Sequence, residues 1–518
     1  MRLQPLGHLT IIWNYYCIHN TLYNANIFLY FKIILLEYNN MVIYKKTQFP
    51  STFLFYDYET FGLHPIYDRI AQFACVRTNM NLEIISQPIT LYCQIPTDYL
   101  PNLQTINIHN FNYHDYFNKY LLEYKFAKYI NNIFTQHNTC IVGYNNIAFD
   151  DEFSRFLFYR NFYDAYNWSW KNDNSRWDIL NLARACCVLR PEGIIWPKHN
   201  HIPIFNLAEI TKVNNLSLHA QSHDALNDVY STIALAKLIK TKQPLLFNYF
   251  FKNRLKKELF KIINLFTIHP LIYISAIYKN MNNNLGCIVP LCLHPYNKNI
   301  LVVFDLQYDV NFFIKIYYHY KIIDISDNLL PFIKFIYLNK SPIIIPIKIL
   351  KKNDIQRLKF NITLYLKHFV IFKQYVYRVK KIVQRYLYNI STKNILYKTT
   401  NIYNVDTQLY KQFFPMQDQK KFYFIRKIDI YKNQIFNFID GRINFLLLKY
   451  KARNFTFLLN DIEIIEWNKY LFDKYKSTQI NNYITQIKNL LCHVHIKTEH
   501  KLFLNKLLLS IKTYLICN

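Results

Sequence analysis

The sequence predicts a multidomain protein of the mixed α/β (α+β) class, and three observations support this prediction. The chain has 518 residues, which is more than one hydrophobic core usually serves. Residues from about 50 to 243 alternate strand and helix patterns, and the stretch to about 375 favours short β-branched runs. Long Lys-rich segments with helical Leu/Ile spacing follow to the C-terminus. We therefore expect domains at 41–243, 244–375 and 376–518.

The first 40 residues stand apart from these domains. They are apolar and aromatic, but their best uninterrupted run, Ile27–Phe31, is far shorter than the roughly 20 residues that span a bilayer. They contain no signal-peptide cleavage pattern. We expect Met41 to be the natural start, residues 1–40 to be a mis-called or poorly ordered extension, and the protein to have no membrane association.

The first predicted strand ends in two carboxylates. In FLFYDYETFG (53–62), Asp57 and Glu59 follow an apolar, aromatic stretch that is typical of a buried strand. Residues i and i+2 of a strand point to the same face, so both acids project together. They repel each other unless a proton or a cation lies between them, and a hard divalent cation is the natural occupant. An isolated Asp-x-Glu is more often a strand that ends in solvated acids.

A second strand and turn lead to another acid. In CIVGYNNIAFDDEFSRF (140–156), an apolar strand and a polar turn precede Asp150, where a helix should begin. Asp151 and Glu152 suit the first turn of that helix. The plainer reading of Asp150 is a charged helix start.

A third segment offers a histidine and a further carboxylate. In SHDALNDVYSTIALAKLIK (222–240), Asp224 is a candidate N-cap, His223 precedes the helix and Asp228 lies on it. A lone histidine at such a place is usually structural or solvated. Together with the earlier acids, however, these residues give four carboxylates, which can hold two divalent ions. The histidine can then take a proton from an attacking water.

The later regions show simpler patterns. Short β-branched runs separated by breakers predict a small barrel-like sheet, with strands expected within 270–278, 285–293, 299–306 and 341–350. Helices are expected at 481–491 and 501–515.

Charge and cysteine content indicate the class of binding partner and the redox compartment. The 62 Lys+Arg exceed the 33 Asp+Glu by 29, which favours a polyanionic partner such as nucleic acid. The abundance of Lys, Asn, Ile and Tyr also fits A/T-rich codon usage, so mutational drift explains the positive charge equally well. The 10 cysteines form no C-x-x-C pair, which favours a reducing cytoplasm. The run CHVHIKTEH (492–500) is a weak candidate zinc cluster, and surface drift is the favoured reading.

The order Asp-x-Glu, Asn-x-x-Phe-Asp and His-x4-Asp resembles the DEDD superfamily of 3′–5′ exonucleases, in its His-containing branch. The segments TFLFYDYETFGLHP, DRIAQFA, GYNNIAFDDE, FYRNFYDAYNWSWKNDNSRWD and LRPEGIIWP resemble its bacterial family of single-strand-specific DNA exonucleases. Weaker likeness continues in LHPYNKN, NVDTQLYKQFF and YKARNF, so the resemblance extends from about Thr52 to the C-terminus. It implies an RNase H-like exonuclease domain, then an SH3-like β domain and a helical C-terminal domain.

The resemblance implies a processive 3′–5′ exonuclease that hydrolyses single-stranded DNA to 5′-mononucleotides in DNA repair and recombination. Two Mg²⁺ ions are expected, and Mn²⁺ should substitute. Asp57 would bridge both ions, Glu59 and Asp228 would complete one shell, and Asp150 would orient the other ion. His223 would be the general base.

Substrate contacts are also implied by resemblance. Glu59, Tyr58 and Thr60 are expected at the terminal nucleotide, with Asn206 standing where the family has an arginine. DNA-binding positions of the family match Arg155, Tyr166, Trp170, Arg184, Lys256 and Asn299. Aromatic rings and cations are the groups that hold single strands. The plainer reading of Tyr166 and Trp170 is that both are core aromatics.

The family also docks the acidic tail of single-strand DNA-binding protein. Arg190 and Tyr249 match that pocket, whereas Lys351 stands where arginine is expected and Pro346 where glutamine is expected. Lysine lacks the bidentate fork of arginine, so docking is expected to be weakened. We expect a monomer in the bacterial cytoplasm. Two alternatives stay open: a related DEDD enzyme that acts on RNA ends or proofreads, and a non-catalytic single-strand-binding protein.

Overall fold

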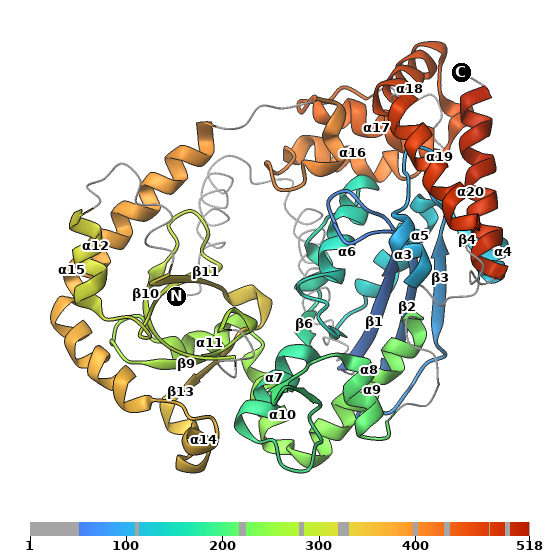
Figure 1. Ribbon diagram of the computed structural model, residues 1–518. Coiled ribbons are helices and arrows are strands. Elements are labelled where there is room, and N and C mark those ends of the chain that lie inside the picture. Colours follow the sequence, from blue (N-terminus) through green and yellow to red (C-terminus); the bar gives the residue numbers. More distant parts are fainter. Residues whose placement is uncertain are drawn as a thin grey trace, which may run out of the picture. The chain divides into compact units, whose positions relative to one another are not determined.

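Two large β-sheets, a two-stranded ribbon and a helical C-terminal region make up the described part of the computed structural model of the protein (Figure 1). It describes residues 51–108, 113–216, 224–278, 284–319, 331–396, 402–428, 436–475, 477–492 and 498–516. All of them belong to the unit Ser51–Asn518.

The first sheet has six strands in the order β4-β3-β2-β1-β5-β6. Strand β1 is interior, and it pairs antiparallel with β2 and parallel with β5. The bounds are β1 Thr52–Thr60, β2 Ile70–Thr78, β3 Ile89–Cys93, β4 Tyr120–Leu121, β5 Thr139–Gly143 and β6 Ser175–Asp178. A mixed sheet joined by helices confirms the predicted α/β pattern of this region.

Helices cover both faces of this sheet, which explains why β1 is apolar along most of its length. Phe53 and Phe55 pack with α7, α9 and α10, whereas Leu54 and Tyr56 pack with α5 and α6. The bounds are α3 Leu103–Ile108, α4 Tyr113–Lys119, α5 Glu123–Phe134, α6 Asp150–Arg160, η1 Asn167–Ser169, α7 Ile179–Leu189, α8 Leu207–Val213, α9 Ala225–Lys242 and α10 Pro244–Asn253. A separate ribbon pairs β7 Lys198–His199 with β8 Ile202–Pro203.

The second sheet has five antiparallel strands in the order β12-β11-β10-β9-β13. The four segments predicted as strands contain β9 Leu271–Ile274, β10 Leu285–Leu293, β11 Ile300–Asp305 and β13 Ile343–Pro346. Strand β12 Ile333–Tyr337 was not anticipated. The associated helices are α11 Lys256–Ile263, η2 Ala276–Tyr278, α12 Val310–His319, η4 Leu338–Lys340, η5 Ile347–Ile349 and α14 Lys352–Arg357.

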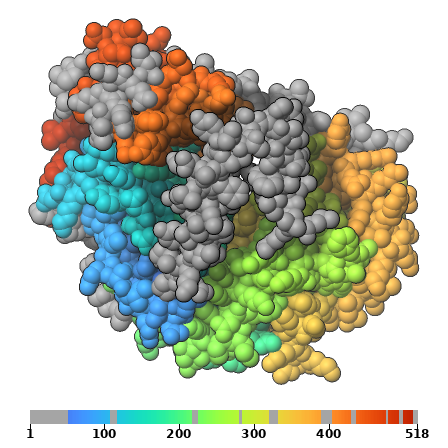
Figure 2. Space-filling model, turned by 180° about the vertical axis from the view of Figure 1, so that it is seen from behind, coloured from blue at the N-terminus to red at the C-terminus, as the bar shows by residue number. Residues whose placement is uncertain are grey.

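Helix α15, Ile362–Leu396, is the longest helix among the described residues and packs against α12 and β10. The domain boundary expected between residues 375 and 376 falls inside it. Its apolar residues join a core that also contains residues of α9, α10 and the second sheet. Figure 2 shows the molecule from behind, where the green part of the chain lies next to the yellow-to-orange part.

The C-terminal region is helical, as predicted. Its elements are η6 Ile402–Thr407, α16 Met416–Ile425, α17 Arg442–Asn454, η7 Thr456–Leu458, α18 Asp461–Lys474, α19 Ser477–Cys492 and α20 Thr498–Ile516. Helix α18 begins with a capping box formed by Asn460 and Glu463. Phe156 and Tyr159 of α6 pack into the core of α16, α17 and α18, so this region is docked on the first sheet.

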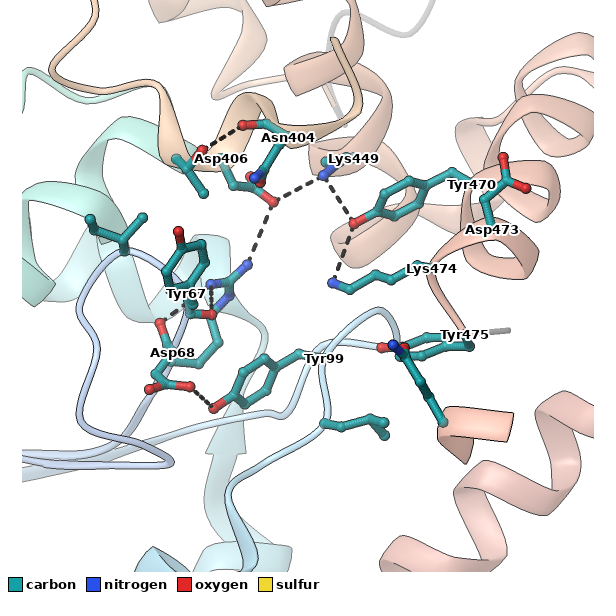
Figure 3. A pocket seen from close by; sticks show the side chains of 15 residues that line it. Tyr67, Asp68, Tyr99, Asn404, Asp406, Lys449, Tyr470, Asp473, Lys474 and Tyr475 are labelled. Atoms are coloured by element: carbon teal, nitrogen blue, oxygen red, sulfur yellow. Dashed lines mark hydrogen bonds and ion pairs between the residues drawn. The ribbon is translucent and has the colours of Figure 1, made fainter. Parts of the chain in front are cut away.

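A buried ion-pair network joins the same two regions. Arg453 of α17 pairs with Asp98 and Asp406, and Lys449 pairs with Asp406 at 3.1 Å. Figure 3 shows Lys449 between Asp406 and Tyr470. A pocket of about 620 Å³ opens beside the network. The cations that line this pocket are already paired with carboxylates. We therefore interpret the network as a structural joint, that is, a set of ion pairs that holds the C-terminal region against the first region.

Two other expectations bear on the described chain. None of its helices combines the length and apolarity needed to cross a membrane. Cys492 is exposed, and His493 and His495 of the candidate zinc run lie outside the described residues.

Candidate active site

Three carboxylates meet at the end of β1. Ligand oxygens of Asp57, Glu59 and Asp228 all lie within 4.8 Å of one another. Asp57 and Glu59 share one face of the strand because side chains alternate along it. Asp228 joins them because α9 packs along β1 and β2 (Figure 1). The structure therefore brings together three of the acids that the sequence predicted as metal ligands.

The start of α9 is fixed by two residues. Asp224 caps the helix, as predicted, by accepting hydrogen bonds from the backbone N–H groups of Leu226 and Asn227. The Gln72 side chain of β2 donates to Asp224 at 3.2 Å and accepts from the Ala225 N–H at 3.2 Å. Asp228 follows one helical turn later and so lies beside β1. Gln72 was not singled out in the sequence, because no local pattern distinguishes it from a strand glutamine.

The electrostatics of the cluster favour a bound cation. Burial raises the pKa of Asp57 well above its ordinary value, and the charges of Asp150, Asp228 and Glu59 raise it further. A carboxylate in such surroundings is stabilised either by a proton or by a cation. Three converging carboxylate oxygens are hard donors, which fit Mg²⁺ or Mn²⁺. The donor set thus fits a divalent metal.

Asp150 lies beside the cluster without being one of the three converging ligands. It is the first residue of α6, as predicted, and its Oδ1 accepts a hydrogen bond from the Tyr58 N–H at 3.3 Å. Burial raises its pKa, and the charge of Asp151 adds to this. After burial, Asp150 has the largest effect on the pKa of Asp57. This position is compatible with orienting a second ion or its waters.

Asp151, the residue after Asp150, forms a buried ion pair with Arg176. Asp151 accepts hydrogen bonds from the Tyr56 hydroxyl at 2.6 Å and from Asn146, and it pairs with Arg176. Arg176 in turn donates to the backbone oxygen of Asn339 at 2.8 Å. The second sheet region thereby contacts the arginine that holds the start of α6. The sequence suggested only that Asp151 suits the first turn of a helix.

The side chains of the residues expected at the terminal nucleotide make different hydrogen bonds within the protein. The Tyr58 ring is buried in the core on the face of β1 opposite Asp57 and Glu59, where its hydroxyl and that of Ser154 share a hydrogen bond of 2.9 Å. The expected place of Tyr58 at the terminal nucleotide stays a prediction. Thr60 is buried, and its hydroxyl donates to the Gly62 oxygen at 2.7 Å. Asn206 caps α8 by accepting from the Glu209 N–H at 3.1 Å.

His223 lies outside the described residues, so its expected role as general base stays a prediction. Its neighbour Asp224 is placed, and it sets where α9 begins.

The aromatic DNA-binding candidates are divided between surface and core. Trp170 is 62% exposed and Tyr166 is half-buried, whereas the neighbouring Trp168 is buried. The core-aromatic reading therefore fails for Trp170. Arg155 lies over the Tyr166 ring, 5.5 Å from its centroid, and pairs with Glu152 at 2.6 Å. Trp170 and Tyr166 therefore offer aromatic surface next to α6, whereas Arg155 itself is buried.

The other DNA-binding candidates occupy two places. Arg184 of α7 is half-buried and lies over the Phe205 ring, 5.8 Å from its centroid. Lys256 and Asn299 lie together beside the second sheet, because Lys256 donates to the Asn299 side chain at 2.6 Å. The structure therefore pairs two residues that are 43 positions apart in the chain.

Two of the candidate partner-binding residues, Arg190 and Lys351, meet at the start of α14. Arg190 Nη1 donates to Asp354 at 2.9 Å, and the backbone N–H of Lys351 donates to the same carboxylate at 2.9 Å. Tyr249 is half-buried on α10, which packs against α7, and Pro346 ends β13. Arg190 is thus already engaged by a carboxylate of the chain itself.

The mixed sheet, with acids that converge from an interior strand and from a flanking helix, fits the class of hydrolytic nucleases that use divalent metal. Comparisons with known proteins are more specific. Residues 54–236 match the family model "Exonuclease", 254–388 match "Exonuclease I SH3-like domain", and 403–514 match "Exonuclease I C-terminal domain". The chain belongs to the exodeoxyribonuclease I family.

Similar proteins match this chain in sequence or in structure over most of its length. Exodeoxyribonuclease I of Buchnera aphidicola subsp. Schizaphis graminum is 42% identical over 85% of this chain and 90% of its own length. A crystal structure of E. coli exonuclease I in complex with a dA16 oligonucleotide is 35% identical and covers 90% of this chain and 99% of that one, with a TM-score of 0.78. A structure of SSB/exonuclease I in complex with an inhibitor covers the same shares at the same TM-score. The resemblance and the fold class inferred from the sequence are confirmed.

Proposed function

We propose that the protein degrades single-stranded DNA processively from the 3′ end and releases 5′-mononucleotides, in DNA repair and recombination. The observation that carries the proposal is the convergence of Asp57, Glu59 and Asp228 within 4.8 Å. Family membership supplies the reaction class, and the relative solved with dA16 supports the substrate. Polarity and product are inferred from the family resemblance.

In this proposal Asp57, Glu59 and Asp228 hold divalent metal, and Asp150 completes the set for a second ion. Mg²⁺ is the expected ion, with Mn²⁺ as a substitute. Such ions supply an activated water and stabilise the leaving 3′ oxygen in phosphodiester hydrolysis. His223 takes the proton of the attacking water, because its ordinary pKa lies near neutrality.

The remaining candidate residues bind and orient the strand. Arg155 attracts a backbone phosphate, while Tyr166 and Trp170 offer rings on which bases stack. The backbone of Tyr58 and Thr60 lines the terminal nucleotide. Asn206 can offer a hydrogen bond there but cannot neutralise a phosphate, so terminal-nucleotide affinity is reduced relative to an arginine.

We also propose that Arg190, Tyr249 and Lys351 form a docking site for the acidic tail of single-strand DNA-binding protein. The relative solved with SSB supports such a partner. Here Asp354 pairs with Arg190 at 2.9 Å and must be displaced or accommodated by the incoming tail. Titration of a labelled tail peptide, with Arg190→Ala as the control, measures whether binding survives.

One experiment tests the main proposal. Two single-stranded oligonucleotides of identical sequence carry a label at the 5′ end or at the 3′ end, and each is digested with Mg²⁺, with Mn²⁺ or with EDTA. Digestion from the 3′ end keeps the label of the first strand on the shortened remainder until the strand is consumed, and it releases labelled mononucleotide at once from the second. EDTA should stop both reactions, and an RNA oligonucleotide of equal length should be degraded more slowly.

Each alternative has its own outcome in that experiment. Equal or faster digestion of RNA would assign the chain to the RNA-end enzymes. Binding without metal-dependent release of mononucleotides would make it a single-strand-binding protein.

A further inference from the structure

Gln72 is a buried glutamine beside the three converging carboxylates. It is 1% exposed, and it lies on β2 directly opposite Glu59 of β1. Residues that lie opposite each other in an antiparallel pair point to the same face of the sheet, so the Gln72 side chain projects on the side of Asp57 and Glu59. A buried carboxamide is normally hydrogen-bonded, and its partners show which segments it holds together.

The Gln72 carboxamide bonds the start of α9 with both of its ends. Its Nε2 donates to Asp224 Oδ2 at 3.2 Å, and its Oε1 accepts from the Ala225 N–H at 3.2 Å. Asp224 uses its other oxygen, Oδ1, to accept from the N–H groups of Leu226 and Asn227. Three N–H groups in the first turn of α9 therefore have side-chain acceptors, and β2 supplies one of these acceptors.

The pairing of β1 with β2 is irregular next to Gln72. Glu59 is opposite Gln72, but the following residue, Thr60, is opposite Ile70, so Ala71 is an extra residue on β2. An extra residue of this kind bends a strand and re-aims its side chains. The distortion thus falls between the strand end that carries Glu59 and the residue that holds α9.

The start of α9 determines where Asp228 lies. Asp228 follows Asp224 by four residues, which is about one helical turn. A helix that began one residue earlier or later would be rotated by about 100° and would carry Asp228 away from the other two ligands. In the structure the ligand oxygens of Asp57, Glu59 and Asp228 lie within 4.8 Å of one another.

Apolar packing holds α9 on the sheet but fixes this rotation less sharply. Val229 and Ile233 of α9 share a core with Phe53 and Phe55 of β1. Apolar contact depends on the area buried and has no preferred direction, whereas hydrogen bonds weaken steeply when their geometry is lost. The directional contacts at the start of α9 are those of Asp224 and Gln72.

We propose that Gln72 is a positioning residue for the metal site. Its carboxamide holds α9 against β2 in the one register that brings Asp228 to Asp57 and Glu59, and it thereby sets the affinity for divalent metal. Gln72 acts through Asp228 and is not itself one of the three converging ligands. The inference rests on the proposed function, because it assigns a further residue to the same site.

The test compares Gln72→Leu with Asn174→Leu. Asn174 is a matched control because it is also a buried carboxamide, which donates to the Phe134 oxygen and accepts from the Thr139 N–H, both at 2.9 Å. Thr139 pairs with Thr52, at the end of β1 away from Glu59. Both variants lose a buried hydrogen-bonding group, so both should have a lower thermal unfolding midpoint.

Only the change at Gln72 should affect metal binding. Calorimetric titration with Mn²⁺, without DNA and below both midpoints, should give a Kd roughly 10- to 100-fold higher for Gln72→Leu, the loss typical of residues that support a ligand. Asn174→Leu should bind Mn²⁺ like the unchanged protein. Gln72→Met, which keeps the length of the side chain, should behave like Gln72→Leu. In digestion assays, Gln72→Leu should need more Mn²⁺ for half-maximal rate and recover most of its turnover at saturating Mn²⁺.

A double variant tests whether the hydrogen bonds themselves matter. Gln72→Glu combined with Asp224→Asn exchanges donor and acceptor and keeps the net charge. The carboxylate at position 72 can accept from the asparagine amide and from the Ala225 N–H, while the asparagine still caps α9. This double variant should bind Mn²⁺ at least nearly as tightly as the unchanged protein.

Three results separate the possible errors. If Gln72→Leu and Gln72→Met bind Mn²⁺ as tightly as Asn174→Leu, the inference is wrong. It is also wrong if the double variant binds as weakly as Gln72→Leu, because the loss would then not come from these hydrogen bonds. If the unchanged protein binds Mn²⁺ but digests no single-stranded DNA, the proposed function fails and the role of Gln72 in metal binding is judged by the titrations.

Discussion

Arg453 and Asp98 form a buried bidentate ion pair across 355 positions of the chain, with Nε–Oδ1 at 2.9 Å and Nη2–Oδ2 at 2.6 Å. Arg453 also bonds both oxygens of Asp406. Burial alone would raise the pKa of Asp98, but the charges of Arg453 and Lys474 outweigh it and hold that pKa well below its ordinary value. The carboxylates therefore stay ionised inside the joint between α17 and the first sheet.

Replacing Arg453 should destabilise the protein strongly. Arg453→Met leaves two buried carboxylates without their main partner, so we expect a loss of about 3–5 kcal/mol in the free energy of unfolding. Lys261→Met is the control, since Lys261 belongs to an exposed pair with Glu258 and should cost less than about 1 kcal/mol. Urea unfolding at neutral pH measures both. Equal costs for the two variants would refute a stabilising role for the joint.

Asp178 should make the free energy of unfolding depend on pH. Burial raises its pKa to about 6, although it accepts hydrogen bonds from the N–H groups of Asn145 and Leu180. The folded state therefore binds more protons than the unfolded state between about pH 4 and pH 6, and stability falls as pH rises through that window. Asp178→Asn removes this titration and keeps an acceptor oxygen.

We expect the free energy of unfolding of Asp178→Asn, relative to the unchanged protein, to rise by about 2–3 kcal/mol from pH 4 to pH 7. Urea unfolding in EDTA at both pH values measures this difference and excludes metal effects. A difference that is the same at both pH values would contradict the raised pKa.

Asp57 and Asp224 should respond differently to the same chemical change. Asp57→Asn removes a converging ligand, so Mn²⁺ binding measured by calorimetry should be lost. Turnover should fall by more than the roughly 10- to 100-fold typical of residues that only support a ligand. Asp224→Asn should keep both, because asparagine caps a helix as well as aspartate does. Retained Mn²⁺ binding in Asp57→Asn would place the metal elsewhere.

Arg176 should act as a positioning residue for the start of α6. Arg176→Met leaves Asp151 without its ion pair, and we expect a roughly 10- to 100-fold loss in turnover or in apparent metal affinity. Arg77→Met is the matched control, since Arg77 is a half-buried arginine that bonds Thr52 and Thr139 at the opposite end of β1. Both variants should lose stability, but only Arg176→Met should raise the Mn²⁺ concentration needed for half-maximal activity.

His223 should be needed for turnover but not for metal binding. His223→Ala should lower turnover roughly 10²–10⁴-fold, as expected for removal of a general base, and should flatten the acid limb of the pH–rate profile. His199→Ala, at an exposed position in β7, is the control and should keep the full rate. Digestion of single strands by His223→Ala at the unchanged rate would remove His223 from the mechanism.

The parts of the site that follow from local patterns were predictable. Strand alternation places Asp57 and Glu59 on one face, and the N-cap at Asp224 fixes the helical turn of Asp228. The same alternation turns the Tyr58 side chain to the opposite face, where the structure places it. The spacing of Asn206 and Glu209 is likewise an N-cap signal that could have been read from the sequence.

Contacts between distant segments were not predictable, because local patterns carry no information on pairing. Asn339 lies 163 positions from Arg176, and nothing near either residue indicates the other. The second sheet region shows a related limit. Helix α12 and the start of α15 lie in the stretch that was expected to favour β patterns. Their apolar residues, among them Phe313 and Phe372, share a core with the second sheet, and this tertiary packing outweighs local propensity.

The pairing of Asp98 with Arg453 also has a consequence for the protein during its synthesis. Asp98 is translated 355 residues ahead of its partner, which at ribosomal speeds of about 5–20 residues per second is a delay of roughly 20–70 s. Until then the carboxylate has no arginine to bury against, and that part of the nascent chain stays open to solvent. The connection between β3 and α3 that carries Asp98 therefore reaches its final packing only when nearly the whole polypeptide has left the ribosome.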